Sequence, residues 1–133
     1  MVRLFHLTSA SAVTNILKEG IKPSETKCLL SLREVQPIER DRAVFAYDEQ
    51  TLRRIAKYGR PDDKVIEFEV DPKQVFIGEL RAECSQKYKE TVRPLSEYLQ
   101  NPEKYSYIEP EIFVPKKIPP EEIIRVLERR EFI

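Results

Sequence analysis

The order of the expected helices and strands is the feature of this sequence that most constrains its fold. Strand patterns are spread out before residue 63 and follow one another more closely after it. A doubly wound parallel sheet would require a helix after each strand. With 133 residues the chain has the size of one domain. The sequence therefore predicts a single α+β domain over residues 1–133, with a split mixed or antiparallel sheet and flanking helices.

The expected elements come from apolar periodicity and from capping and turn residues. Gly20 suits the left-handed position after a helix end, where Ile21 can pack back on the helix. Asp48 suits a helix N-terminus, as do Thr8 and Ser9. In chain order we expect a strand over 2–8, a helix over 9–19, a long loop over 22–42 with a short helix near 29–35, a strand over 43–47, a helix over 49–58, strands over 64–70 and 74–80, polar helical structure over 81–104 interrupted by Pro94, and a strand over 105–114.

The C-terminal segment has the pattern of a last helix. Two prolines and two glutamates over 119–122 are typical of a first helical turn. Arg125 lies four residues after Glu121, at the spacing of a helical ion pair. The expected buried stripe of this helix is Ile123, Ile124 and Leu127, and residues 132–133 add a short strand or a packed tail.

The charge balance excludes a strong general attraction to polyanions. The chain has 23 basic and 23 acidic residues, so no net charge draws it to nucleic acid or an anionic membrane, although a local basic patch stays open. No apolar run approaches the ~20 residues that span a bilayer, and the N-terminus lacks a signal-peptide pattern. We therefore expect a cytoplasmic protein, and its high Lys, Arg and Glu content is typical of thermophiles.

Metal binding is not expected from the residue types present. The chain has one histidine and two widely separated cysteines, Cys28 and Cys84. This set does not provide the ligands of a common zinc site. The cysteines are expected to be reduced, structural thiols, as is usual in the cytosol, although one disulfide stays open.

His6 stands near the end of the first expected strand. Side chains two residues apart share a strand face, so Thr8 points to the same side as His6. A ring nitrogen and a hydroxyl that point together can bind a ribose hydroxyl or a carboxamide. The strand also passes into a helix here, at a common place for a ligand pocket. The alternative is a strand histidine that hydrogen-bonds a neighbour.

Two glutamates, Glu109 and Glu111, interrupt the apolar strand expected over 105–114. Alternation puts both on one face with Tyr107 and Phe113. The opposite face, which we expect to be core, carries Ile108, Ile112 and Val114. The two acids either lie on a solvated outer face or line a cleft, where a carboxylate orients a sugar hydroxyl or stabilises positive charge.

Other candidate binding groups are an aromatic residue and several arginines. Tyr47 ends a strand and is either ordinary packing or a platform for a flat ring. The arginines that could bind phosphates, or lie solvated on the surface, are Arg33, Arg40, Arg42 and Arg53. The chain has none of the glycine-rich phosphate-binding loops and no serine-hydrolase elbow motif.

Three segments together resemble the ADP-ribosyltransferase-like superfamily. The segment Leu-Phe-His-Leu-Thr-Ser, followed by Ala-Val-Thr-Asn-Ile-Leu-Lys-Glu-Gly-Ile-Lys-Pro-Ser, is similar to the opening of DarT-type DNA ADP-ribosyltransferases and RNA 2′-phosphotransferases. Val-Phe-Ala-Tyr, with Tyr47, resembles the strand that supplies the middle residue of a His-Tyr-Glu triad. Pro-Glu-Ile-Phe-Val-Pro-Lys-Lys-Ile-Pro-Pro-Glu-Glu-Ile-Ile-Arg-Val resembles the late strand with the catalytic glutamate and its exit.

The resemblance implies an enzyme that transfers ADP-ribose from NAD to a nucleic acid or a protein, as some toxins do. It implies that Glu111 is catalytic, with Glu109 as the competing choice, and that NAD is a substrate with no metal required. The NAD-binding residues that it implies are His6, Thr8 and Tyr47, with Arg33 and Arg42 as candidates for the family's arginine. The paired arginines of RNA 2′-phosphotransferases are not matched, so that activity is not expected.

Two other hypotheses remain open at the level of sequence. A module of the same fold that has lost catalysis would still bind a nucleotide or a partner through the His6 pocket. A purely structural or interaction domain would instead hold His6 and Glu111 far apart.

Overall fold

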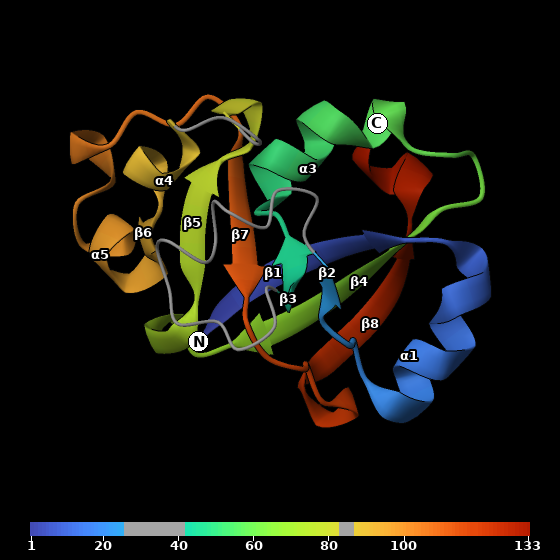
Figure 1. The fold of residues 1–133 in the computed structure, drawn as a ribbon. Helices are drawn as coiled ribbons and strands as arrows, with labels where there is room; N and C mark the ends of the chain where they lie inside the picture. The colour runs from blue at the N-terminus through green and yellow to red at the C-terminus, as the bar shows by residue number, and fades with distance from the viewer. Residues whose placement is uncertain (26–41, 83–86) are drawn as a thin grey trace.

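The computed structural model describes residues 1–25, 42–82 and 87–133. Figure 1 shows two sheets whose strands run in clearly different directions, with short helices around them. Both sheets are antiparallel throughout their paired strands. The α+β class and the split sheet expected from the sequence are confirmed.

The first sheet has three strands in the order β1-β4-β8. Strand β1 (Val2–Thr8) pairs along its whole length with β4 (Lys64–Val70), from Val2 opposite Val70 to Thr8 opposite Lys64. Both strands have the bounds predicted from the sequence. In β4 the expected apolar face, with Ile66, Phe68 and Val70, packs into the core, whereas β1 has mixed faces and contributes Leu4 and Phe5 to two different clusters. Strand β8 (Ile123–Glu128) covers the other edge of β4.

Strand β8 corrects the prediction of a last helix. The prolines and glutamates form only a 3-10 turn, η6 (Pro120–Glu122), and the chain then becomes extended. The N–H and C=O groups at the edge of β4 need partners, and a β-branched segment satisfies them better as a strand than as a helix. Arg125 accordingly lies opposite Glu67 and not beside Glu121. Ile124, expected to be buried, falls at a register shift and is 41% exposed.

The second sheet has five strands in the order β2-β3-β7-β5-β6. Its central strand β7 is half as long as expected, because pairing begins only at Pro110. The bounds are β2 (Ser24–Glu25), β3 (Arg42–Ala46), β7 (Pro110–Val114), β5 (Phe76–Glu79) and β6 (Arg93–Pro94).

Local signals placed two helices correctly. Helix α1 (Val13–Glu19) follows η1 (Ala10–Ala12) and ends at Gly20. Its φ of 88° is positive, as expected for a glycine there, but its ψ of −179° is extended and not that of the left-handed helical conformation. No side chain caps its start, because the Ser9 hydroxyl bonds that of Ser11, so capping by Thr8 or Ser9 was wrong. Helix α3 (Glu49–Ile55) begins as predicted, with the Asp48 carboxylate accepting from the Thr51 N–H at 2.7 Å.

The remaining segments are short. Within the region expected to be helical over 81–104, the structure has α4 (Tyr88–Thr91) and α5 (Leu95–Gln100), separated by β6. The short helix expected near 29–35 lies outside the described residues. The other 3-10 turns are η2 (Ala56–Tyr58), η3 (Pro72–Gln74), η4 (Leu80–Ala82), η5 (Pro102–Lys104) and η7 (Arg129–Phe132).

The main core draws side chains from both sheets. It includes Leu4, Ile66 and Phe68 of the first sheet and Ile112 and Val114 of the second. Smaller clusters lie on the other faces: one beneath α3 and the C-terminus, and one beside α4. Within the described ranges, no helix is long and apolar enough to cross a membrane.

Candidate functional site

His6 connects the two sheets through its side chain. Its Nδ1 lies 2.7 Å from the carbonyl oxygen of Phe45 on β3. A carbonyl only accepts, so Nδ1 donates and the neutral ring keeps Nε2 as its acceptor. Burial lowers the pKa of His6, while the bond to Phe45 opposes this effect. His6 is therefore held as a neutral imidazole with a defined tautomer.

Tyr47, directly after β3, lies beside β1 next to the position of His6. Its backbone exchanges two hydrogen bonds of 2.9 Å with Phe5, the residue before His6. Its side chain packs against the cluster that includes Phe5 and Leu52. The end of β3 thus runs alongside β1, and Tyr47 and His6 occupy neighbouring positions on the two strands.

Glu111 lies inside the molecule on β7. Its side chain is 3% exposed, so the solvated outer face that sequence reasoning left open does not exist at this position. The Tyr88 hydroxyl of α4 lies 3.4 Å from Glu111 Oε1. Glu111 also faces Gly78 across the β5–β7 pair. A Cβ at Gly78 would come within 2.9 Å of the Tyr88 hydroxyl, so the glycine leaves room for this tyrosine over the strand.

Strand β3 lies between the strands that carry His6 and Glu111. The carbonyl that binds His6 belongs to Phe45, which pairs with Phe113 on β7. Phe113 is two residues beyond Glu111 and shares its strand face. The structure therefore brings His6, Tyr47 and Glu111 onto three neighbouring strands, β1, β3 and β7.

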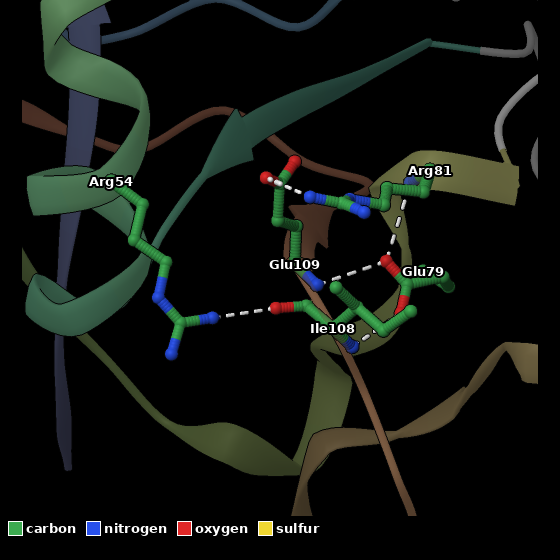
Figure 2. Close-up of polar contacts among 5 residues, drawn as sticks. All are labelled: Arg54, Glu79, Arg81, Ile108 and Glu109. Atoms are coloured by element: carbon green, nitrogen blue, oxygen red, sulfur yellow. Dashed lines mark hydrogen bonds and ion pairs between the residues drawn. The ribbon is translucent and has the colours of Figure 1, made fainter.

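Glu109 lies just before β7, in a different environment from Glu111. Its side chain is 21% exposed and its Oε1 lies 3.4 Å from Arg81 Nη2 (Figure 2). Ile108, expected in the core, is 54% exposed, because strand alternation does not extend before Pro110. The Ile108 carbonyl accepts a 2.7 Å hydrogen bond from Arg54 of α3.

The other candidate residues are dispersed. Thr8 is partly buried opposite Lys64 at the end of β1. The backbone of Arg42 begins β3 opposite Glu25. Arg53 contacts Glu49, the Glu131 carbonyl and the Phe132 ring, which is a structural role. The candidates outside the described residues are Arg33, Arg40, Cys28 and Cys84.

Two residues near the site were missed by sequence reasoning. These residues are Tyr88 and Glu79. The segment of Tyr88 showed only a general helical pattern, and the sequence sign that a side chain approaches β5 closely was Gly78 inside that strand. Glu79 follows Gly78, is 8% exposed, and has its carboxylate turned toward the backbone of residues 108–109. In the described part of the chain, no group of three His, Cys, Asp or Glu side chains is arranged to hold a metal ion.

Comparison with known proteins identifies the fold. No protein-family model matches the sequence, and no curated protein matches it. Among solved structures, the chain is similar to Thermosipho africanus DarTG in complex with ADP-ribose, with a TM-score of 0.51 and 14% sequence identity. The match covers 95% of this chain and 43% of that one, so the protein spans less than half the length of its structural relative. The chain therefore shares the fold of part of DarTG, in agreement with the split-sheet α+β architecture expected from the sequence.

Proposed function

We propose that this protein is an ADP-ribosyltransferase that uses NAD as its donor and a macromolecule, nucleic acid or protein, as its acceptor. The observation that carries the proposal is the position of His6, Tyr47 and Glu111 on three neighbouring strands of a fold shared with a protein solved with ADP-ribose. The proposal requires that the three side chains serve one cleft.

The reaction exchanges one bond at the anomeric carbon of the nicotinamide ribose. The bond between C1′ and the pyridinium nitrogen breaks, and its electron pair leaves with neutral nicotinamide. The acceptor nucleophile forms a new bond to C1′ and loses its proton. Positive charge develops on the ribose ring in the transition state, so a carboxylate close to the ribose lowers the barrier. Glu111 supplies that carboxylate by accepting a hydrogen bond from a ribose hydroxyl.

His6 acts as a neutral group that orients the donor. Because Nδ1 is engaged by Phe45, Nε2 accepts a hydrogen bond from the adenosine ribose or the nicotinamide amide. Tyr47 stacks beside the nicotinamide ring, and Thr8 supports the same edge of NAD. Arg33 and Arg42 supply positive charge for the diphosphate.

One observation favours a second function, a nucleotide-binding module without catalysis. Glu111 is 3% exposed and the Tyr88 hydroxyl lies against its carboxylate. A ribose hydroxyl would have to share or replace that contact. If the contact persists when NAD is bound, the protein binds the nucleotide without breaking the glycosidic bond.

The test combines calorimetric titration of NAD with transfer of label from NAD to DNA, RNA and protein acceptors. We expect binding by the wild type and by Glu111→Gln, with transfer abolished in that variant. Glu109→Gln is the matched control, because it changes an acid two residues away. Retained transfer in Glu111→Gln together with its loss in Glu109→Gln would reverse the two roles. Binding without nicotinamide release by the wild type would favour the binding module, and absence of NAD binding would reject both.

A further inference from the structure

Glu79 buries its carboxylate against backbone N–H groups of another strand. It is the last residue of β5 and is 8% exposed. Its Oε1 accepts from the Ile108 N–H at 2.5 Å, and its Oε2 accepts from the Glu109 N–H at 3.0 Å. Oε2 also lies 3.2 Å from the Arg81 N–H. A buried carboxylate is costly unless hydrogen bonds satisfy it, and three backbone donors do so here.

The same short segment is held from other directions (Figure 2). The Glu109 carbonyl accepts from the Leu80 N–H at 2.9 Å, and the Ile108 carbonyl accepts from Arg54 at 2.7 Å. Arg81, whose N–H binds Glu79, places its guanidinium on the Glu109 carboxylate. Residues 108 and 109 are therefore fixed although they precede the paired part of β7.

The position of this segment determines where Glu111 enters the strand. β7 begins at Pro110, directly after the two amides that Glu79 binds, and Glu111 is the next residue. The β5–β7 ladder ends at Pro110, and beyond it the Leu80 N–H still bonds the Glu109 carbonyl. The Glu79 carboxylate supplies the acceptor for the two N–H groups of Ile108 and Glu109. Without the Glu79 carboxylate, the N–H groups of Ile108 and Glu109, just before β7, would lose their acceptor.

From this geometry we infer that Glu79 is the positioning residue for the segment 108–111 and so for the Glu111 carboxylate. Its catalytic consequence rests on the proposed function, whereas its structural part does not. Glu79 touches no reacting atom in this scheme. It acts through the backbone that carries Glu109 and Glu111.

The experiment compares Glu79→Gln with Glu67→Gln. Glu67 is the matched control, because it is a buried acid at 3% exposure in the other sheet. Hydrogen exchange of single amides is measured by NMR, with the Ile66 N–H as an internal reference for global stability. The glutamine keeps the size of the side chain and one carbonyl oxygen but loses one acceptor oxygen.

In Glu79→Gln, we expect the amide exchange rates of Ile108 and Glu109 to rise about tenfold relative to that of Ile66. In Glu67→Gln, we expect the ratio of these rates to the Ile66 rate to stay as in the wild type. In transfer assays, kcat should fall about tenfold or more in Glu79→Gln while KM for NAD changes less than about twofold, because transition-state contacts are affected and not general binding.

Unchanged exchange at these amides, or equal acceleration in both variants, would overturn the assignment. Accelerated exchange with an unchanged kcat would also overturn it, because Glu111 would then not depend on Glu79. An inactive wild type contradicts the proposed function only, and the exchange comparison still decides whether Glu79 holds the segment.

Discussion

The two sheets bury carboxylates in different ways. In the three-stranded sheet, Glu67 is 3% exposed and lies 2.9 Å from the guanidinium of Arg125, directly across the strand pair. In the five-stranded sheet, Glu111 is also 3% exposed, and its Oε1 lies 3.4 Å from the Tyr88 hydroxyl. Glu79 of that sheet binds backbone amides.

The difference teaches that burial by itself does not mark a functional acid. A cation opposite a carboxylate neutralises its charge and makes it a structural element. Glu67 and Glu111 are equally buried, so the exposed fraction does not separate the structural role of Glu67 from the role that we propose for Glu111. That proposed role rests on the position of Glu111 on β7, next to β3.

The largest expected effect is on transfer activity. Glu111→Gln should lower kcat by about 100-fold or more, because a neutral amide no longer stabilises positive charge on the ribose. Glu67→Gln should leave kcat nearly unchanged while lowering stability. Transfer of labelled ADP-ribose and urea unfolding of both variants provide the measurement. Equal loss of activity in the two variants would contradict the distinction between a structural Glu67 and a catalytic Glu111.

The next effect is on stability. Arg125→Ala removes the cation opposite Glu67 and should lower the free energy of unfolding by about 1–3 kcal/mol, the cost of a buried polar group without its partner. Adding Glu67→Gln to this variant should restore part of the loss, because the two residues are coupled. Urea unfolding of the single and double variants tests this. Strictly additive losses would contradict the coupling.

A smaller effect is expected at Tyr88. Tyr88→Phe keeps the ring over Gly78 and removes only the hydroxyl near Glu111. It should change the free energy of unfolding by about 0.5–1.5 kcal/mol and tighten NAD binding, because the carboxylate becomes more accessible to a ribose hydroxyl. Tyr58→Phe, at a tyrosine that is 77% exposed, is the control. Weaker NAD binding by Tyr88→Phe would mean that the phenol assists the ligand instead of competing with it.

The smallest effect concerns His6, which joins the two sheets. Burial lowers its pKa below the ordinary value of 6.5, so the unfolded chain binds a proton at a higher pH than the folded one. Well above pH 6.5 His6 is neutral in both states and does not make stability depend on pH. As the pH falls from 6.5 through the folded pKa, stability should decrease.

The measurement is urea unfolding of the wild type and His6→Gln at several pH values below 7. Because the chain has a single histidine, the variant should lack the decrease that begins near pH 6.5. An identical pH dependence in both proteins would show that His6 is not held neutral by the fold.

Local sequence signals predicted the elements whose stability is itself local. The alternation over 64–70, the capping carboxylate of Asp48 and the positive φ of Gly20 each act within a few residues, and each was confirmed. The prediction of a helix in the segment 119–128 was wrong, because its first turn has helical signals while its later residues suit a strand. The free edge of β4, more than 50 residues earlier in the chain, decided the outcome.

The sequence by itself determined the α+β class, the two long strands of the first sheet and the candidates His6, Tyr47 and Glu111. Only the tertiary structure decided their surroundings: the Phe45 carbonyl on His6, the Tyr88 hydroxyl on Glu111 and the Glu79 carboxylate on the amides of residues 108–109. These contacts join residues 23 to 39 positions apart. Periodicity and capping act over a few residues, whereas the partner of a buried polar group is set by which strands become neighbours.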